Sequence, residues 1–333
     1  MVRLRRTSPE MPGWTRRRAG RGFSYLDMAG ERLPESEVQR IKGLAIPPAW
    51  REVWISPFSH GHLQAVGTDD AGRRQYLYHP AWRARRDAEK FDRMIGFGQA
   101  LTSARATVLA DLGQPGMPLE RACAAAIRLI DLGYFRIGND VYADANGSFG
   151  LTTLERRHVR RRGQRLVFTF TGKSGVDHRI EIDDPGVIEA VAIMRRRRME
   201  DTRLLAYQEA RSWRSVLPAT VNDYLRLRTD TEGTAKDFRT WHATVLAATA
   251  LADTAEHGET GASRKRAVSA AMKDVSAYLG NTPALARSAY VDPRVIEAYH
   301  RGETIDATAT SVFTSPDERQ VAVERAVLAL LAD

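Results

Sequence analysis

The sequence has little of what several protein classes require. Its 333 residues include one cysteine, Cys123, which excludes an internal disulfide and a zinc site built from cysteines. The longest small-apolar run, 243–252, is far shorter than the roughly 20 residues of a membrane helix. The histidines are not spaced as metal-ligand pairs, and no glycine-rich phosphate loop is found. The residues therefore predict no metal, no nucleotide cofactor and no membrane partner.

Positive charge, by contrast, is abundant. Lysine and arginine number 50 against 41 acidic residues, which gives a net charge of +9 at pH 7. An excess of this size favours a polyanionic partner, meaning nucleic acid or an anionic membrane. A lone, reduced cysteine fits a cytoplasmic protein.

The N-terminal part is basic first and β-like afterwards. Residues 1–22 carry seven arginines against one glutamate, so we predict a flexible basic arm. Short β-like runs follow at 53–56, 63–69 and 74–79, and the last two are separated by turn residues at 70–72. We therefore predict a small, mostly antiparallel N-terminal domain over residues 23–88.

Helical spacing dominates the rest of the chain. The predicted helices are 90–112, 117–133, 187–200, 201–212, 218–229, 236–254, 264–279, 283–290, 293–300 and 317–332. Between residues 140 and 183, three β-like runs interrupt them, at 149–154, 166–172 and 178–183. The predicted fold is α+β, in which the β-rich N-terminal domain is followed by a larger, mainly α-helical domain over 89–333 with a small inserted antiparallel sheet.

Four polar motifs stand out in the larger domain. They are FRIGND (135–140), TGKSGVDH (171–178), KDFRTWH (236–242) and GNTPALARSAY (280–290). Their candidate site residues are Arg136, Lys173, Lys236, Arg239, Asn281 and Tyr290. Alone, each cation fits an ordinary solvated turn or helix face, and a tyrosine at a helix end usually packs. Together they would surround one phosphate with cations and offer it one phenolic nucleophile.

Local spacing adds detail to two of these motifs. Lys236, Arg239 and Thr240 fall on one helical face near an N-terminus, and small side chains there would leave room for an anion. Asn281 falls in the break between two helices, where its amide is free to hydrogen-bond. The run of four arginines at 195–198 is predicted to be a helix face that touches solvent or DNA backbone.

In this order, the motifs resemble those of the type IB DNA topoisomerases, specifically the small poxviral and bacterial branch. The hairpin GRRQYLYHP (72–80) also resembles that branch, so the resemblance covers roughly residues 23–330. It implies that Tyr290 forms a 3′-phosphotyrosyl bond and that Arg136 and Arg239 bind the non-bridging oxygens. Lys173 would be the general acid for the leaving 5′-oxygen, and Lys236 an auxiliary basic residue.

The same resemblance implies where DNA is contacted. The expected DNA-binding residues are Gln75, Tyr76 and Tyr78 in the hairpin, and Tyr142, Thr152 and Thr153 in the larger domain. Asn281 stands where the family usually has a histidine, and an amide can donate a hydrogen bond but cannot carry charge. Asn139 and Val141 replace basic residues of the poxviral enzymes, so site preference is expected to differ.

The expected function is relaxation of supercoiled DNA by cleavage, strand rotation and religation, without ATP or metal. The enzyme would be a monomer clamped around duplex DNA in the bacterial cytoplasm, at the nucleoid. One alternative is a tyrosine recombinase or integrase, which shares the arginine, lysine and tyrosine chemistry but requires a tetramer that pairs two sites. The other alternative is a basic DNA-binding protein without enzymatic activity.

Overall fold

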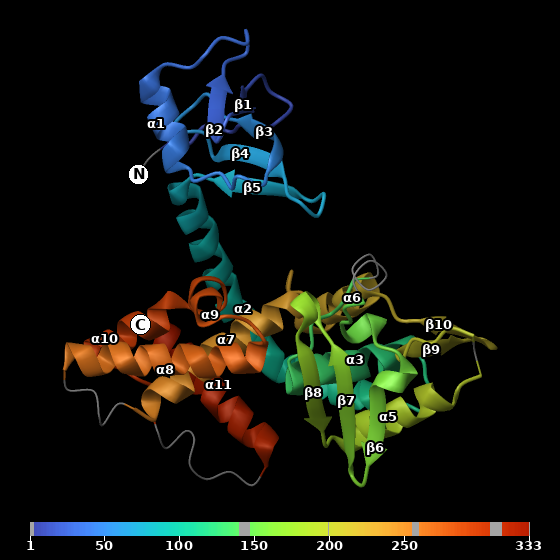
Figure 1. Cartoon of the computed structure of the whole chain (residues 1–333). Coiled ribbons are helices and arrows are strands. Elements are labelled where there is room, and N and C mark those ends of the chain that lie inside the picture. Colours follow the sequence, from blue (N-terminus) through green and yellow to red (C-terminus); the bar gives the residue numbers. More distant parts are fainter. Residues whose placement is uncertain (1–2, 140–146, 199, 255–259, 307–314, 333) are drawn as a thin grey trace. The chain divides into compact units, whose positions relative to one another are not determined.

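The computed structural model describes residues 3–139, 147–198, 200–254, 260–306 and 315–332 (Figure 1). The chain forms two compact units, Met1–Asp92 and Arg93–Asp333. Each unit has a hydrophobic core of its own. The boundary between the units falls at Asp92, a few residues beyond the predicted limit of the first domain at residue 88.

The first unit is built on a five-stranded antiparallel sheet with strand order β2-β1-β3-β4-β5. Its elements are β1 (Trp14–Ala19), β2 (Gly22–Leu26), α1 (Glu35–Gly43), β3 (Arg51–Ile55), β4 (Leu63–Thr68) and β5 (Arg74–Tyr78). Helix α1 packs Ile41 against Trp14, Ile55 and Ala65 of the sheet. The predicted antiparallel sheet is confirmed, although β1, β2 and α1 were not predicted.

The prediction of a flexible basic arm is wrong for the described residues 3–22. Trp14 is buried at the start of β1, which pairs with β2 and β3. In the same strand, the Arg16 guanidinium donates to the carbonyl oxygens of Ile46, Pro47 and Trp50 at 3.1, 3.0 and 2.6 Å. An arginine-rich run is typical of a solvated arm, but here one of its cations donates to backbone carbonyls of the loop before β3.

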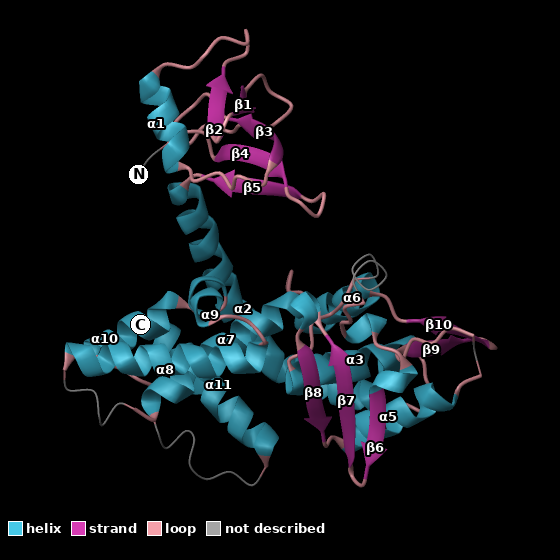
Figure 2. Ribbon diagram, viewed as in Figure 1, coloured by secondary structure: helices cyan, strands magenta, loops and turns pink. Residues whose placement is uncertain are grey.

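The second unit is mainly helical. Helix α2 (Pro80–Leu112) begins in the first unit and continues into the second. The other helices are α3 (Leu119–Gly133), α5 (Pro185–Arg196), α6 (Pro218–Thr229), α7 (Ala235–Ala252), α8 (Gly261–Leu279), α9 (Pro283–Ala289), α10 (Pro293–Arg301) and α11 (Pro316–Ala332). A three-stranded antiparallel sheet, β6 (Val159–Arg162), β7 (Arg165–Thr171) and β8 (Asp177–Ile182), is inserted between α3 and α5, and β9 (Ala206–Glu209) and β10 (Ser212–Ser215) form a separate hairpin (Figure 2).

Helix α3 forms the centre of this core, because nearly all of its residues are buried. Its alanines, 122 and 124–126, have small side chains that let α5, α6 and α7 approach closely. Gly98 of α2 leaves room for a side chain of α7, since a Cβ at this position would lie 2.5 Å from the Trp241 ring. Trp241 is fully buried two residues after Arg239, so the same packing that fixes α7 also fixes that arginine.

Two local predictions for this unit are wrong. Residues 201–212 contain β9 and the start of β10, and not a helix. Residues 149–154, predicted as a strand, contain the short 3-10 helix η1 (Leu151–Thr153). In the run 195–198, three arginines are exposed, but Arg197 is 5% exposed and donates to the carbonyl oxygens of Met194 and Leu204, so it closes the end of α5.

Candidate active site

Two arginines from distant parts of the chain converge on one carbonyl group. Arg239, on the first turns of α7, donates through Nη2 to the Leu279 oxygen at 2.5 Å and through Nη1 to the Tyr134 oxygen at 3.0 Å. Arg136, just after α3, donates to the same Leu279 oxygen at 3.2 Å and to the Gly280 oxygen at 3.0 Å. The end of α8 therefore fixes both guanidinium groups side by side.

The electrostatics of this pair favour an anion. Arg239 is 4% exposed, and burial together with the charge of Arg136 lowers the pKa of Arg239 to about 10. Burial also lowers the pKa of Arg136. Both side chains stay charged at neutral pH, and among the described residues no carboxylate bonds to either of them. A phosphate group would supply the negative charge that the two cations lack.

Tyr290 ends helix α9 next to this pair. The Arg239 guanidinium carbon lies 5.6 Å from the centre of the tyrosine ring, which is partly buried. The segment is tied to α7 through Thr244, whose hydroxyl lies 3.4 Å from the Tyr290 carbonyl oxygen and accepts from the Asp292 N–H at 3.1 Å. The phenol is thus held on the same side of α7 as Arg239.

Asn281 lies between α8 and α9. Gly280 ends α8 in a left-handed conformation (φ 58°), and the Thr282 hydroxyl accepts from the Leu285 N–H to begin α9. Both polar atoms of the Asn281 side chain are buried, and neither has a hydrogen-bond partner within the described residues. Buried amides are nearly always satisfied, so the unpartnered amide one residue after Gly280 makes Asn281 a candidate for binding the same group as the two arginines.

The two candidate lysines are placed differently. Lys173 is exposed in the β7–β8 turn, which the Gly172 N–H closes by donating to the Val176 oxygen at 2.7 Å. Lys236 is exposed on the first turn of α7. In the described parts of the chain no hydrogen bond or ion pair joins either lysine to Arg136, Arg239 or Tyr290. The structure therefore brings four of the six candidates together and leaves both lysines outside that cluster.

The expected open space beside Lys236 is not found. Thr240 and Ala243, predicted to leave room for a ligand, are 2% and 0% exposed. The Thr240 carbonyl accepts from the Thr244 hydroxyl at 3.0 Å. Helical spacing places these residues on the same side of α7 as Arg239, but that side packs into the core.

The expected DNA-contacting residues differ in their exposure to solvent. Tyr76 and Tyr78 are exposed on β5, with rings stacked at 6.3 Å, whereas Gln75 donates to the Asp69 carboxylate at 2.9 Å. Thr152 and Thr153 are 0% and 5% exposed, and their hydroxyls donate to the backbone oxygens of Ile137 and Gly150. Both side chains are buried and hold the backbone that follows Arg136, so in this structure neither hydroxyl is exposed to a partner.

Tyr142, the remaining DNA-contact prediction, lies outside the described residues.

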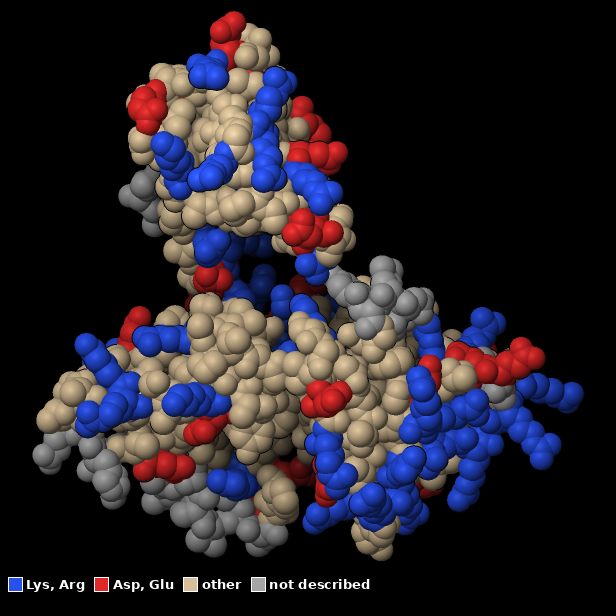
Figure 3. Space-filling model, viewed as in Figure 1, with Lys and Arg blue, Asp and Glu red and all other residues tan. Residues whose placement is uncertain are grey.

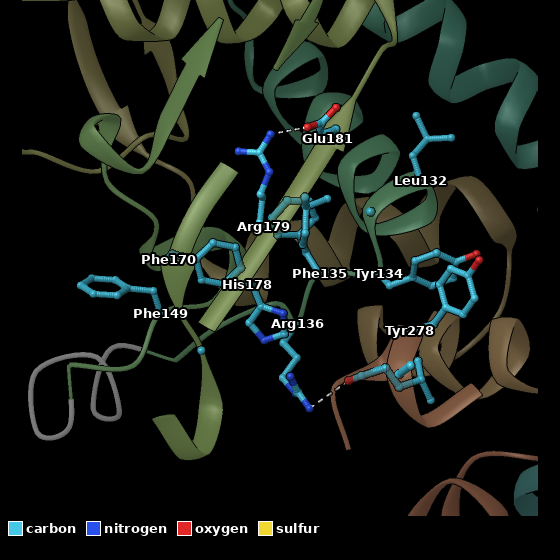
Figure 4. A pocket seen from close by; sticks show the side chains of 15 residues that line it. Leu132, Tyr134, Phe135, Arg136, Phe149, Phe170, His178, Arg179, Glu181 and Tyr278 are labelled. Atoms are coloured by element: carbon cyan, nitrogen blue, oxygen red, sulfur yellow. Dashed lines mark hydrogen bonds and ion pairs between the residues drawn. The ribbon is translucent and has the colours of Figure 1, made fainter. Parts of the chain in front are cut away.

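A cavity of about 340 Å³ adjoins the arginine pair (Figure 4). Its lining includes Tyr134, Arg136, Phe170, His178 and Tyr278. His178 was not predicted to belong to the site, although it is the last residue of the TGKSGVDH motif. Burial and the charges of Arg136 and Arg239 lower the pKa of His178 below its usual 6.5. The ring is therefore mostly neutral at neutral pH.

Behind the site lies a buried ionic network that the motifs did not reveal. The Asp131 carboxylate accepts from Arg105 at 2.7 Å and contacts the His242 ring nitrogen Nε2 at 2.9 Å. Arg105 also donates to Glu324 of α11. His242 in turn packs edge-on against the Tyr134 ring, whose backbone oxygen receives Arg239. The network joins α2, α3, α7 and α11 beneath the arginine pair.

The surface is rich in cations. Figure 3 shows Lys and Arg gathered over the part of the larger unit that contains β6 and the end of α5. The exposed arginines there include 160–162, 195 and 196. Within the described residues, no group of three or more His, Cys, Asp or Glu side chains could hold a metal ion. The described helices also include none that is both long and apolar enough to cross a membrane.

The chain has a basic surface and a helical unit in which two arginines lie beside a tyrosine. This fold and this site define the class of enzymes that transfer DNA strands through a tyrosine. Comparison with known proteins narrows it. The family model described as the catalytic core of eukaryotic DNA topoisomerase I matches residues 79–311, and the N-terminal domain of bacterial DNA topoisomerase IB matches residues 22–69. A DNA topoisomerase 1B of Acanthamoeba polyphaga mimivirus is 28% identical over 298 residues, covering 87% of this chain and 88% of the viral protein. The chain belongs to the type IB DNA topoisomerase family.

Proposed function

We propose that this topoisomerase relaxes supercoiled duplex DNA through a covalent bond to Tyr290. The phenolic oxygen gives up its proton to solvent and attacks the phosphorus of one strand, so that an Oη–P bond forms while the bond from phosphorus to the 5′-oxygen breaks. The products are a 3′-phosphotyrosyl end and a free 5′-hydroxyl. The observation that carries the proposal is the pair Arg136 and Arg239, whose guanidinium groups share one carbonyl beside the Tyr290 ring.

Each of the residues around Tyr290 has a proposed role in this reaction. Arg136 and Arg239 bind the non-bridging oxygens, on which charge grows in the transition state. Asn281 donates a hydrogen bond to the phosphoryl group from its unpartnered amide. Lys173 gives a proton to the departing 5′-oxygen, which is a strong base as an alkoxide. Lys236 contributes positive charge at the start of α7.

Religation reverses these steps. The 5′-hydroxyl attacks the phosphotyrosine and returns its proton to Lys173, while the Oη–P bond breaks and the released Tyr290 oxygen takes a proton from solvent. Since the phosphodiester is exchanged for a phosphotyrosyl ester of comparable energy, ATP is not required. In the proposed steps the positive charge at the phosphate comes from the arginines and lysines of the chain, so no metal is invoked. Rotation of the duplex between the two steps relaxes supercoils.

The DNA partner is proposed to be enclosed by a monomer acting in the bacterial cytoplasm, at the nucleoid. Gln75, Tyr76 and Tyr78 of β5 would face the duplex from the first unit. Two exposed, stacked phenols support this proposal, because aromatic rings with polar tips are common where one end of a side chain meets a partner and the other meets water.

The test is a plasmid relaxation assay with EDTA and without ATP. Positively and negatively supercoiled plasmids are expected to relax equally, since free rotation has no preferred direction. A protein that requires a divalent metal for all activity would overturn the proposed mechanism.

A further inference from the structure

His178 occupies the space between two glycines that flank candidate catalytic residues. A Cβ on Gly172 would lie 2.7 Å from Cδ2 and 2.8 Å from Nε2 of the imidazole. A Cβ on Gly280 would lie 3.0 Å from Cε1 of the same ring. Because only glycine leaves room for the ring, the imidazole lies directly against both backbones. Gly172 precedes Lys173, and Gly280 precedes Asn281.

The ring is itself held firmly. His178 pairs with Phe170 across β7 and β8, and the two rings stack at 5.1 Å with an angle of 24° between their planes. Figure 4 shows both rings lining the cavity near Arg136. The charged or titratable groups that face the imidazole are Arg136, Arg239 and Asp177. A mostly neutral ring can pack beside the two arginines without adding a third like charge.

The Lys173 side chain, by contrast, has no contacts among the described residues that fix its direction. Its side chain is exposed and makes no hydrogen bond or ion pair with any described residue. Its direction therefore depends on the backbone of the turn, in which Ser174 (φ 65°) and Gly175 (φ 73°) are left-handed. The imidazole of His178 is the side chain in contact with the first residue of that turn.

We propose that His178 is a positioning residue, whose imidazole holds the Lys173 turn against the segment that carries Asn281. This inference rests on the proposed function, in which Lys173 protonates the leaving 5′-oxygen. The ring touches neither the substrate nor the transferred proton. It fixes the distance between the acid-bearing turn and the arginine pair, which share no hydrogen bond in the described structure.

The experiment measures single-turnover cleavage of two duplexes, one with the natural bridging 5′-oxygen and one with sulfur in its place. A thiolate leaves without protonation, so sulfur removes the need for the acid. His178→Ala is expected to cleave the oxygen substrate on the order of 10- to 100-fold more slowly, as misplacement of a catalytic group does. On the sulfur substrate its rate is expected to be close to that of the wild type.

A second variant tests the contact between His178 and Gly172 by changing the glycine. Gly172→Ala would push a methyl group into the imidazole and displace the turn, so it should also be slow on oxygen and normal on sulfur. Combined with His178→Ala, the added methyl meets no ring, and the two defects should be clearly non-additive. His300→Ala, at an exposed histidine of α10, is the matched control and should cleave both substrates normally.

Lys173→Ala is measured in parallel. If sulfur restores Lys173→Ala but not His178→Ala, or if His178→Ala is normal on oxygen, the positioning role is refuted while the proposed function stands. If sulfur fails to restore Lys173→Ala, Lys173 is not the acid, and both the acid assignment and this inference fall.

Discussion

At the scale of single residues, the site holds two neighbouring positive charges that no carboxylate of the described chain neutralises. Arg136 and Arg239 crowd one carbonyl, and burial with mutual repulsion lowers the pKa of Arg239 to about 10. Binding a phosphate between them relieves that repulsion.

Replacement of the proposed nucleophile, Tyr290, would separate DNA binding from strand cleavage. Tyr290→Phe keeps the ring beside Arg239 but lacks the oxygen, so it should bind DNA with nearly wild-type affinity and form no covalent adduct on denaturing gels. Tyr278→Phe, at an exposed tyrosine near the same cavity, is the matched control and should retain adduct formation. An adduct with Tyr290→Phe would mean that Tyr278 or Tyr299 is the nucleophile.

Asn281 is expected to act as a neutral donor. Asn281→Ala should slow cleavage about 10²-fold, comparable to the loss of one oxyanion donor. Asn281→His should be tolerated, since an imidazole can donate the same bond and carry charge. Single-turnover cleavage measures both, and unchanged cleavage by the alanine variant would remove Asn281 from the site.

His178 also makes a pH prediction. Its pKa is lowered in the folded chain from 6.5, first by burial and then by Arg136 and Arg239. The unfolded chain therefore binds this proton more readily, and the free energy of unfolding should fall as the pH drops below 6.5. In urea titrations at about pH 7.5 and about pH 5.5, His178→Gln should lose less stability than the wild type. His300→Gln should behave like the wild type, and equal losses in all three proteins would contradict the prediction.

Motif chemistry predicted part of the site. Arg136, Arg239, Asn281 and Tyr290 are brought together as expected, because each motif supplies a residue whose chemistry suits a phosphate. Thr152 and Thr153 could not be judged from sequence, since a hydroxyl that holds a backbone carbonyl and one that binds DNA look alike in one chain. His178 was missed because its contacts beside Lys173 and Asn281 are with two glycines, which leave no side-chain pattern to detect.

At the scale of elements, the buried network of Arg105, Asp131 and Glu324 joins three helices beneath the site. Burial alone would lower the pKa of Arg105, but the two carboxylates outweigh it and raise that pKa. Arg105→Met would leave two buried carboxylates without their cation, and should reduce the free energy of unfolding by about 3–5 kcal/mol. Arg226→Met breaks an exposed pair with Asp223 and should change stability little. Chemical denaturation of both variants is the measurement, and equal effects would contradict the prediction.

Most helices of the larger unit were predictable from their spacing and first-turn prolines, as in α6, α9 and α10. The β9–β10 hairpin was not, because its turn contains Ala210 in a left-handed conformation (φ 53°) and no Gly, Asn or Pro to mark it. In the first unit, β1 was hidden by its arginines, one of which serves the backbone of the loop at 46–50.

At the scale of the whole molecule, the net charge of +9 should dominate DNA affinity. The logarithm of the association constant should fall with the logarithm of salt concentration by about 0.9 for each phosphate neutralised. Arg74→Ala, at an exposed arginine of β5, should reduce this slope by about one. Tyr76→Ala should weaken binding without changing the slope, because a phenol neutralises no phosphate. A slope near zero for the wild type would argue against an extended backbone footprint.

The double contact of Thr244 with the backbone at Tyr290 and Asp292 has a mechanical consequence. In the proposed intermediate, in which a strand is attached to Tyr290, torque from the turning duplex would pull on the short α9 segment. Thr244 would transmit this force to the middle of α7, a helix of 18 residues whose Trp241 ring packs against Gly98 of α2. The element that bears the strain is thus the one that carries Arg239, so the phosphotyrosine and its cation move together and stay aligned for resealing.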